Sequence, residues 1–164
     1  MNDKVIIFLD LDGVLITQWS EYQPIGSRFK EFAKPFQKEG VGIINQIIEE
    51  YNAEIVLSSD WRYVFNKQML GEYFKINGIK QEPIRMPYDC RGEFRDKRLY
   101  PNYKELRRSK EIEMYVTEYK VKRFVIFDDM ALSCFPENFI QTEFETGLTE
   151  DFREKIWIIL NKIC

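Results

Sequence analysis

The fold is decided by the stretch VIIFLDLDGVL, residues 5–15, in which an apolar run leads directly into two carboxylates. The run Val5–Leu9 predicts a buried strand. Asp10 and Asp12 follow on the same side of the chain, because side chains of an extended segment alternate with a period of two, and Gly13 allows a sharp turn there. In an open parallel sheet, ligands bind beyond the carboxyl ends of the strands. Two acids this close repel each other unless they share a cation or a proton, so the pair predicts a divalent metal site at that edge.

Length and composition set the outer limits of the prediction. The chain has 164 residues, of which 45% are hydrophobic and 15% aromatic, which predicts a single domain over residues 1–164 with a sizeable core. Its three cysteines, Cys90, Cys134 and Cys164, are odd in number and lack metal-ligand spacing, which indicates a reducing compartment, and we expect the cytoplasm. No apolar stretch approaches the length of about 20 residues that crosses a bilayer, so no membrane association is expected.

The chain contains no histidine. This absence excludes Ser-His-Asp and Cys-His nucleophile schemes, histidine-ligated zinc and an imidazole base. Any chemistry must therefore use carboxylates, hydroxyls, Lys or Arg, and metal. The formal net charge is -3, but residues 85–110 carry nine Lys and Arg against four Asp and Glu, a local balance of +5 that leaves -8 for the rest.

Strand and helix signals alternate along the chain, which predicts an α/β fold with a central, mostly parallel sheet. The expected strands are Val5–Leu9, Glu54–Leu57, Arg123–Phe127 and Phe139–Gln141, with a short one at Ile84–Met86. The expected helices are Arg28–Ala33, Ile43–Tyr51, a helix capped by Ser59 or Asp60 that runs to about Phe74, a helix capped by Ser109 that runs to Tyr119, and Asp151–Ile163. Most of the remainder, including residues 83–104, is predicted to be loop, and a long loop in a compact domain is more often functional than filler.

Reactive side chains follow three of the expected strands and open one expected helix. These positions are Asp10 with Asp12, Ser58, Lys110, and Asp128 with Asp129. In order and spacing they resemble the four motifs of the haloacid dehalogenase (HAD) superfamily of phosphohydrolases. The matching stretches are DLDGVL at residues 10–15, IVLS at 55–58, RSKEI at 108–112 and FVIFDD at 124–129. More narrowly, LSSDWR at 57–62, RSKEI and the segment 141–149 look like the cap-poor branch associated with RNA repair proteins.

The resemblance implies a Rossmann-like three-layer sandwich with helices on both faces of the sheet and a minimal cap. It also implies a Mg²⁺-dependent phosphomonoesterase that works through an aspartyl-phosphate. Asp10 would attack phosphorus, and Asp12 would donate a proton to the leaving alcohol and later take one from water. Mg²⁺ would be held by Asp10, the backbone carbonyl of Asp12 and Asp128, with Asp129 supporting through water.

The phosphoryl oxygens would be bound by Ser58, Ser59 and nearby backbone N–H groups, and Lys110 would neutralise the nucleophile and the developing charge. Arg107 and Arg108 are adjacent alternatives for that charge. We prefer Lys110, because arginine binds as a rigid fork and not as a point charge.

The segments that can cover the site, residues 17–39 and 83–105, indicate the class of substrate. Both are short for a folded cap domain, and an open site favours large substrates. The candidate substrate contacts are Trp61, Arg62, Arg91, Arg95 and Arg98. Basic residues interleaved with aromatics fit phosphates and stacked bases, which favours RNA or DNA end phosphates. An equally supported interpretation is a solvated charged loop whose aromatics pack into the core, and Trp61 fits a core position equally well.

Other functional classes stay open at this point. A small-metabolite phosphatase acting on a sugar or nucleotide phosphate would use the same motifs. A phospho-acceptor signalling domain also groups Asp, Ser or Thr and Lys around Mg²⁺, but its acceptor normally follows a later strand than Asp10 does. A non-catalytic binding module is the third alternative. Taken singly, each motif also has a structural explanation, since Asp-Gly forms ordinary turns and Ser58 or Asp128 can cap a helix.

Overall fold

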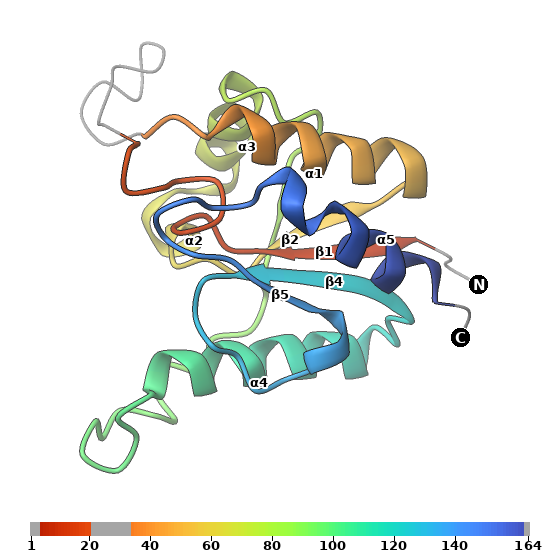
Figure 1. Ribbon diagram of the computed structural model, residues 1–164. Helices are drawn as coiled ribbons and strands as arrows, with labels where there is room; N and C mark the ends of the chain where they lie inside the picture. Colours follow the sequence, from red (N-terminus) through yellow and green to blue (C-terminus); the bar gives the residue numbers. More distant parts are fainter. Residues whose placement is uncertain (1–3, 21–33, 163–164) are drawn as a thin grey trace.

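The computed structural model describes residues 4–20 and 34–162, which form a five-stranded sheet with helices on both sides (Figure 1). The strands are β1 Val5–Leu9, β2 Glu54–Leu57, β3 Ile84–Arg85, β4 Arg123–Asp128 and β5 Phe139–Gln141. Their order is β3-β2-β1-β4-β5, and every neighbouring pair is parallel. The predicted α/β class is therefore confirmed, and β1 lies at the centre of the sheet.

The helices divide between the two faces of the sheet (Figure 1). They are α1 Lys38–Tyr51, the one-turn α2 Trp61–Val64, α3 Lys67–Ile76, α4 Tyr103–Glu118 and α5 Arg153–Asn161. Residues of α1, α3 and α5 pack in one hydrophobic cluster, and residues of α4 pack in a second cluster on the opposite face. This arrangement is the expected Rossmann-like three-layer sandwich.

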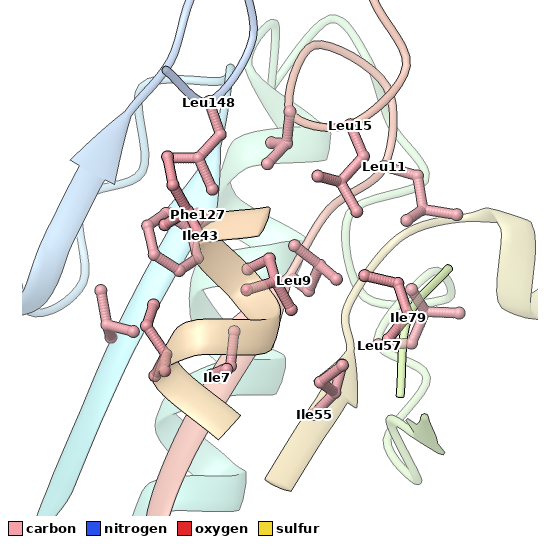
Figure 2. Packing of buried hydrophobic residues seen from close by; sticks show 14 of the residues in the cluster. Ile7, Leu9, Leu11, Leu15, Ile43, Ile55, Leu57, Ile79, Phe127 and Leu148 are labelled. Atoms are coloured by element: carbon pink, nitrogen blue, oxygen red, sulfur yellow. The ribbon is translucent and has the colours of Figure 1, made fainter. Parts of the chain in front are cut away.

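The side chains of β1 alternate between these two clusters. Ile7 and Leu9 face α1, where Figure 2 shows them near Ile43, whereas Ile6 and Phe8 face α4. Every residue of the strand is buried, because helices cover both faces, and each such side chain contributes roughly 1.5–3 kcal/mol of hydrophobic stabilisation. The uninterrupted apolar run at residues 5–9 is the sequence signature of this two-sided burial.

Three predicted helices differ clearly from the structure, and the first of them, expected over Ile43–Tyr51, begins at Lys38. The helix expected to run from Ser59 or Asp60 to about Phe74 is divided into α2 and α3. The side-chain oxygen of Asn66 accepts a hydrogen bond from the backbone N–H of Met69 at 2.9 Å, and this cap starts a new helix. The helix expected to begin at Ser109 begins at Tyr103 instead. Ser109 lies buried within α4, where its hydroxyl accepts a hydrogen bond from the backbone of Ser133, so it is not a cap.

The two segments expected to cover the site, residues 17–39 and 83–105, fall mostly in the connections that follow β1 and β3. The expected helix Arg28–Ala33, and with it part of the expected cover segment 17–39, lies outside the described residues. Between β3 and α4, residues 86–102 form turns and irregular chain, so the expected loop is present, and in Figure 1 it extends away from the sheet. No helix in the described part of the chain is both long enough and apolar enough to cross a membrane.

Candidate active site

The three central strands bring their carboxyl ends to one place. Leu9 of β1 is in register with Leu57 of β2 and Phe127 of β4. The next residues along the chain, Asp10, Ser58 and Asp128, therefore emerge side by side, and the backbone N–H groups of Asp10 and Ser58 donate to Phe127 and Leu9 at 3.0 Å. All three are buried. Residues separated by more than one hundred positions in the sequence thus meet because parallel strands end at the same edge.

Three carboxylates cluster at this edge. Asp10, Asp128 and Asp129 each offer an oxygen, and these oxygens lie within 4.8 Å of one another. Burial and, next, the charge of Asp10 raise the pKa of Asp129 from 3.8 to about 6. Burial also raises the pKa of Asp128. Carboxyl oxygens gathered this closely form a set of hard donors suited to a divalent cation.

A buried arginine from α4 lies between two of these acids. Nη1 of Arg108 is 2.8 Å from Oδ2 of Asp10 and 2.7 Å from Oδ2 of Asp128. Burial lowers the pKa of Arg108, but Asp10 and Asp128 outweigh that effect and raise it, so the guanidinium stays charged. Two of the three clustered carboxyl groups thus share the guanidinium of Arg108.

The structure places Arg108, and not Lys110, at the position expected for the basic residue. Nζ of Lys110 pairs with Glu93 on the loop before α4, and its side chain is 41% exposed. Two residues along an α-helix differ by about 200° in direction, so only one of the two cations can face the acids. Arg108 shares a face with Ile112 and Tyr115, which are buried against the sheet, at the helical spacing i, i+4, i+7. The spacing itself can be seen in the sequence, but only the packing of α4 against the sheet shows that this face of the helix is the buried one.

The side chain of Ser58 has no partner among the residues that the structure describes. The residue is fully buried, and its Oγ has no hydrogen bond to any described residue of the protein. Leaving a buried hydroxyl unsatisfied costs roughly 1–3 kcal/mol, which a ligand oxygen would recover. The neighbouring Ser59 has a different local role, since its Oγ accepts a 3.4 Å hydrogen bond from the backbone N–H of Trp61 at the start of α2. Both hydroxyls therefore still have a hydrogen to donate to an anion at this edge, and that of Ser58 has no other partner among the described residues.

Asp12 lies at the mouth of the site and is exposed. Its Oδ2 accepts a 2.8 Å hydrogen bond from the indole Nε1–H of Trp61. Desolvation raises the pKa of Asp12, and the bond from Trp61 opposes that rise. Gly13 follows with φ +74°, and a Cβ there would lie 2.5 Å from Asp129, so this close approach requires glycine.

Of the expected substrate contacts, Arg62 is excluded by its burial. It is 1% exposed, and it pairs with Glu111 at 2.5 Å and donates to the backbone oxygen of Ser58 at 2.6 Å. Arg62 of α2 therefore links this helix to α4 and to the end of β2, and its side chain is not accessible to a substrate.

The arginines of the loop before α4 lie at the surface. Arg91 pairs with Asp89 and lies over the ring of Tyr63 at 3.8 Å, and Arg98 pairs with Asp96. Arg95 is exposed on the same loop. Part of the local positive charge is thus balanced within the loop, while the arginines stay accessible to a ligand.

Comparisons with known proteins agree with this geometry. A family model described as the HAD domain in Swiss Army Knife RNA repair proteins matches residues 6–152, from β1 to the residue before α5. No curated protein and no solved structure matches the chain. The matched region contains every residue of the site described above.

Proposed function

Because the chain belongs to the family of HAD domains in Swiss Army Knife RNA repair proteins, we propose that it is a Mg²⁺-dependent phosphomonoesterase that acts through an aspartyl-phosphate. The observation that carries the proposal is the convergence of Asp10, Asp128, Arg108 and the unpartnered Ser58 at one edge of the sheet. This set provides a nucleophile, oxygen ligands for a cation and donors for a phosphoryl group.

The metal would be held by Asp10, Asp128 and Asp129, together with the backbone carbonyl of Asp12. Carboxylate oxygens are the ligands that Mg²⁺ prefers, and those of Asp10 and Asp128 share one guanidinium, that of Arg108. When bound, the cation would supply positive charge to the phosphoryl oxygens.

The protein's own groups would perform the two displacements. A carboxylate oxygen of Asp10 attacks phosphorus, the bond from phosphorus to the alcohol oxygen breaks, and Asp12 gives its proton to that oxygen. Asp12 then takes a proton from the water that attacks the aspartyl-phosphate, which restores Asp10 and releases phosphate. Arg108 holds the other oxygen of Asp10, and the hydroxyl of Ser58 donates to a phosphoryl oxygen.

For the substrate, we propose a phosphate at the end of an RNA or DNA strand. The family description refers to RNA repair, and the described part of the cover consists of loops and not of a folded cap domain. Arg91, Arg95 and Arg98 are exposed on the loop between β3 and α4, where Phe94 packs edge-on against Tyr100. Such a mixture suits a phosphate backbone with unstacked bases.

The direct test is hydrolysis of an aryl phosphate by the wild-type protein, Asp10→Asn and the control Asp151→Asn, which changes an exposed acid outside the site. Turnover by the wild type is expected with Mg²⁺ and not with EDTA, and Asp10→Asn should lose roughly 10³-fold or more in kcat. The control should match the wild type. Equal turnover by wild type and Asp10→Asn would contradict the assignment.

The substrate is tested separately. Oligonucleotides of RNA and DNA with a 3′- or 5′-phosphate are compared with a panel of sugar and nucleotide phosphates by kcat/KM. A strand end should be the best substrate. A strong preference for a metabolite would leave the mechanism standing and remove the nucleic-acid proposal.

A further inference from the structure

The contact between Trp61 and Asp12 joins two distant parts of the chain at the mouth of the site. Trp61 is the first residue of α2, and its indole Nε1–H donates to Oδ2 of Asp12, 49 residues earlier, at 2.8 Å. This length is ordinary for a well-formed N–H···O hydrogen bond. The bond therefore fixes one oxygen of the side chain that follows the nucleophile by two residues.

The indole itself is held by other aromatic rings. Its centroid lies 5.3 Å from that of Phe65 and 5.8 Å from that of Tyr73, both of which are buried. The hydroxyl of Tyr73 donates to the backbone oxygen of Lys34 at 2.5 Å, which anchors that ring in turn. Aromatic contacts at these separations add to the stabilisation that burial alone provides. The indole N–H is thus presented by a packed cluster and not by a mobile surface side chain.

Asp12 needs such a restraint more than its neighbours do. Asp10 and Asp128 are buried and held by Arg108, whereas Asp12 is exposed and has Asp10 as a nearby like charge. An exposed carboxylate rotates readily about χ1 and χ2, and the nearby charges act on it in opposite directions, since Asp10 repels it while Lys34 and Arg108 attract it. The bond from Trp61 selects one orientation and leaves Oδ1 as the oxygen available for proton transfer.

We infer that Trp61 is a positioning residue that orients Asp12 for proton donation to the leaving oxygen. The inference rests on the proposed function. As the bond from phosphorus to oxygen breaks, the proton on Asp12 Oδ1 moves to the leaving oxygen, and Asp12 becomes a carboxylate. Its hydrogen bond from Trp61 then gains a charged acceptor and strengthens. Trp61 consequently assists the step in which an alkoxide must be protonated.

The effect of Trp61 should depend on the leaving group. Trp61→Phe keeps an aromatic ring and removes the N–H donor, and Trp157→Phe on the exposed face of α5 is the matched control. We compare kcat/KM for benzyl phosphate, whose alkoxide needs a proton, and for 2,4-dinitrophenyl phosphate, whose phenolate leaves unprotonated. Trp61→Phe should lose about 10–100-fold on benzyl phosphate, the effect of one hydrogen bond to a charged group, and less than about 3-fold on the aryl ester.

A cycle with Asp12→Asn separates positioning from general damage to the site. Asp12→Asn should show the same leaving-group pattern, and adding Trp61→Phe to it should cost little more, because both changes remove one function. Equal losses on both esters, or losses that add fully to those of Asp12→Asn, would overturn the inference. If the wild type hydrolyses neither ester, the proposed function has failed instead.

The bond is also measured without catalysis. The chain has three tryptophans, so its ¹⁵N spectrum contains three indole signals, and Trp61→Phe identifies one of them by its loss. Asp12→Asn should shift that signal and leave those of Trp19 and Trp157 in place. An unchanged Trp61 signal would overturn the inference. If Trp61→Phe does not fold, Trp19→Phe and Trp157→Phe assign the signals by elimination, and the same comparison applies.

Discussion

Replacing Asp129 by asparagine should stabilise the metal-free protein at neutral pH. Asp129 lies in the acidic cluster, where burial and then Asp10 raise its pKa from 3.8 to about 6. A tenfold change in proton affinity corresponds to about 1.4 kcal/mol, so keeping this group ionised costs about 3 kcal/mol of folding free energy. The side chain is partly exposed, and solvent screening reduces the expected gain to roughly 1–3 kcal/mol.

The pH dependence has a definite sign. The folded protein binds the proton of Asp129 more tightly than the unfolded chain does, so this group leaves stability intact below pH 3.8 and lowers it progressively as the pH rises towards about 6. Asparagine carries no charge in either state and removes that loss. The advantage of Asp129→Asn should therefore be full near about pH 7.5 and fall to about 1 kcal/mol or less near about pH 4.5.

Urea unfolding with EDTA at both pH values measures this difference, with Asp151→Asn as the control for an exposed acid. In excess Mg²⁺ the order should reverse, because the wild type gains binding free energy through a ligand that Asp129→Asn has weakened. Wild-type and variant stabilities that coincide at both pH values, or a variant that is less stable without metal, would refute the electrostatic account of the cluster.

Two further predictions concern the interior of the site. Ser58→Ala removes a buried hydroxyl that has no partner among the described residues, so the free energy of unfolding of the variant should equal that of the wild type or exceed it by up to about 1 kcal/mol. Its kcat/KM should fall roughly 10²-fold. A variant that lost both stability and activity would contradict this role. Glu111→Gln should destabilise the fold by roughly 3–5 kcal/mol, because it leaves Arg62 charged and buried without its acid. In a urea-unfolding cycle, Arg62→Met with Glu111→Leu should cost much less than the single changes together, and full additivity would speak against a coupled pair.

Much of the fold could be predicted because its signals are local. The apolar runs at β1, β2 and β4 identify the central strands without reference to any partner, since a strand buried on both faces must be apolar throughout. Acids and a hydroxyl that directly follow such strands mark the ligand edge of a parallel sheet. The division into α2 and α3 of the helix expected to end near Phe74 was missed, because the cap at Asn66 competes with a continuous helical pattern.

The sequence by itself determined the parallel sheet and the edge at which Asp10, Ser58, Asp128 and Asp129 gather. Only the tertiary structure decided which cation joins them, because the rotation of α4 is fixed by the packing of Ile112 and Tyr115 against the sheet, and that rotation turns Arg108 inwards and Lys110 outwards. The end of a buried strand is marked in the sequence by the polar residues that directly follow its apolar run. The direction of a helical side chain depends instead on which face of its helix is buried.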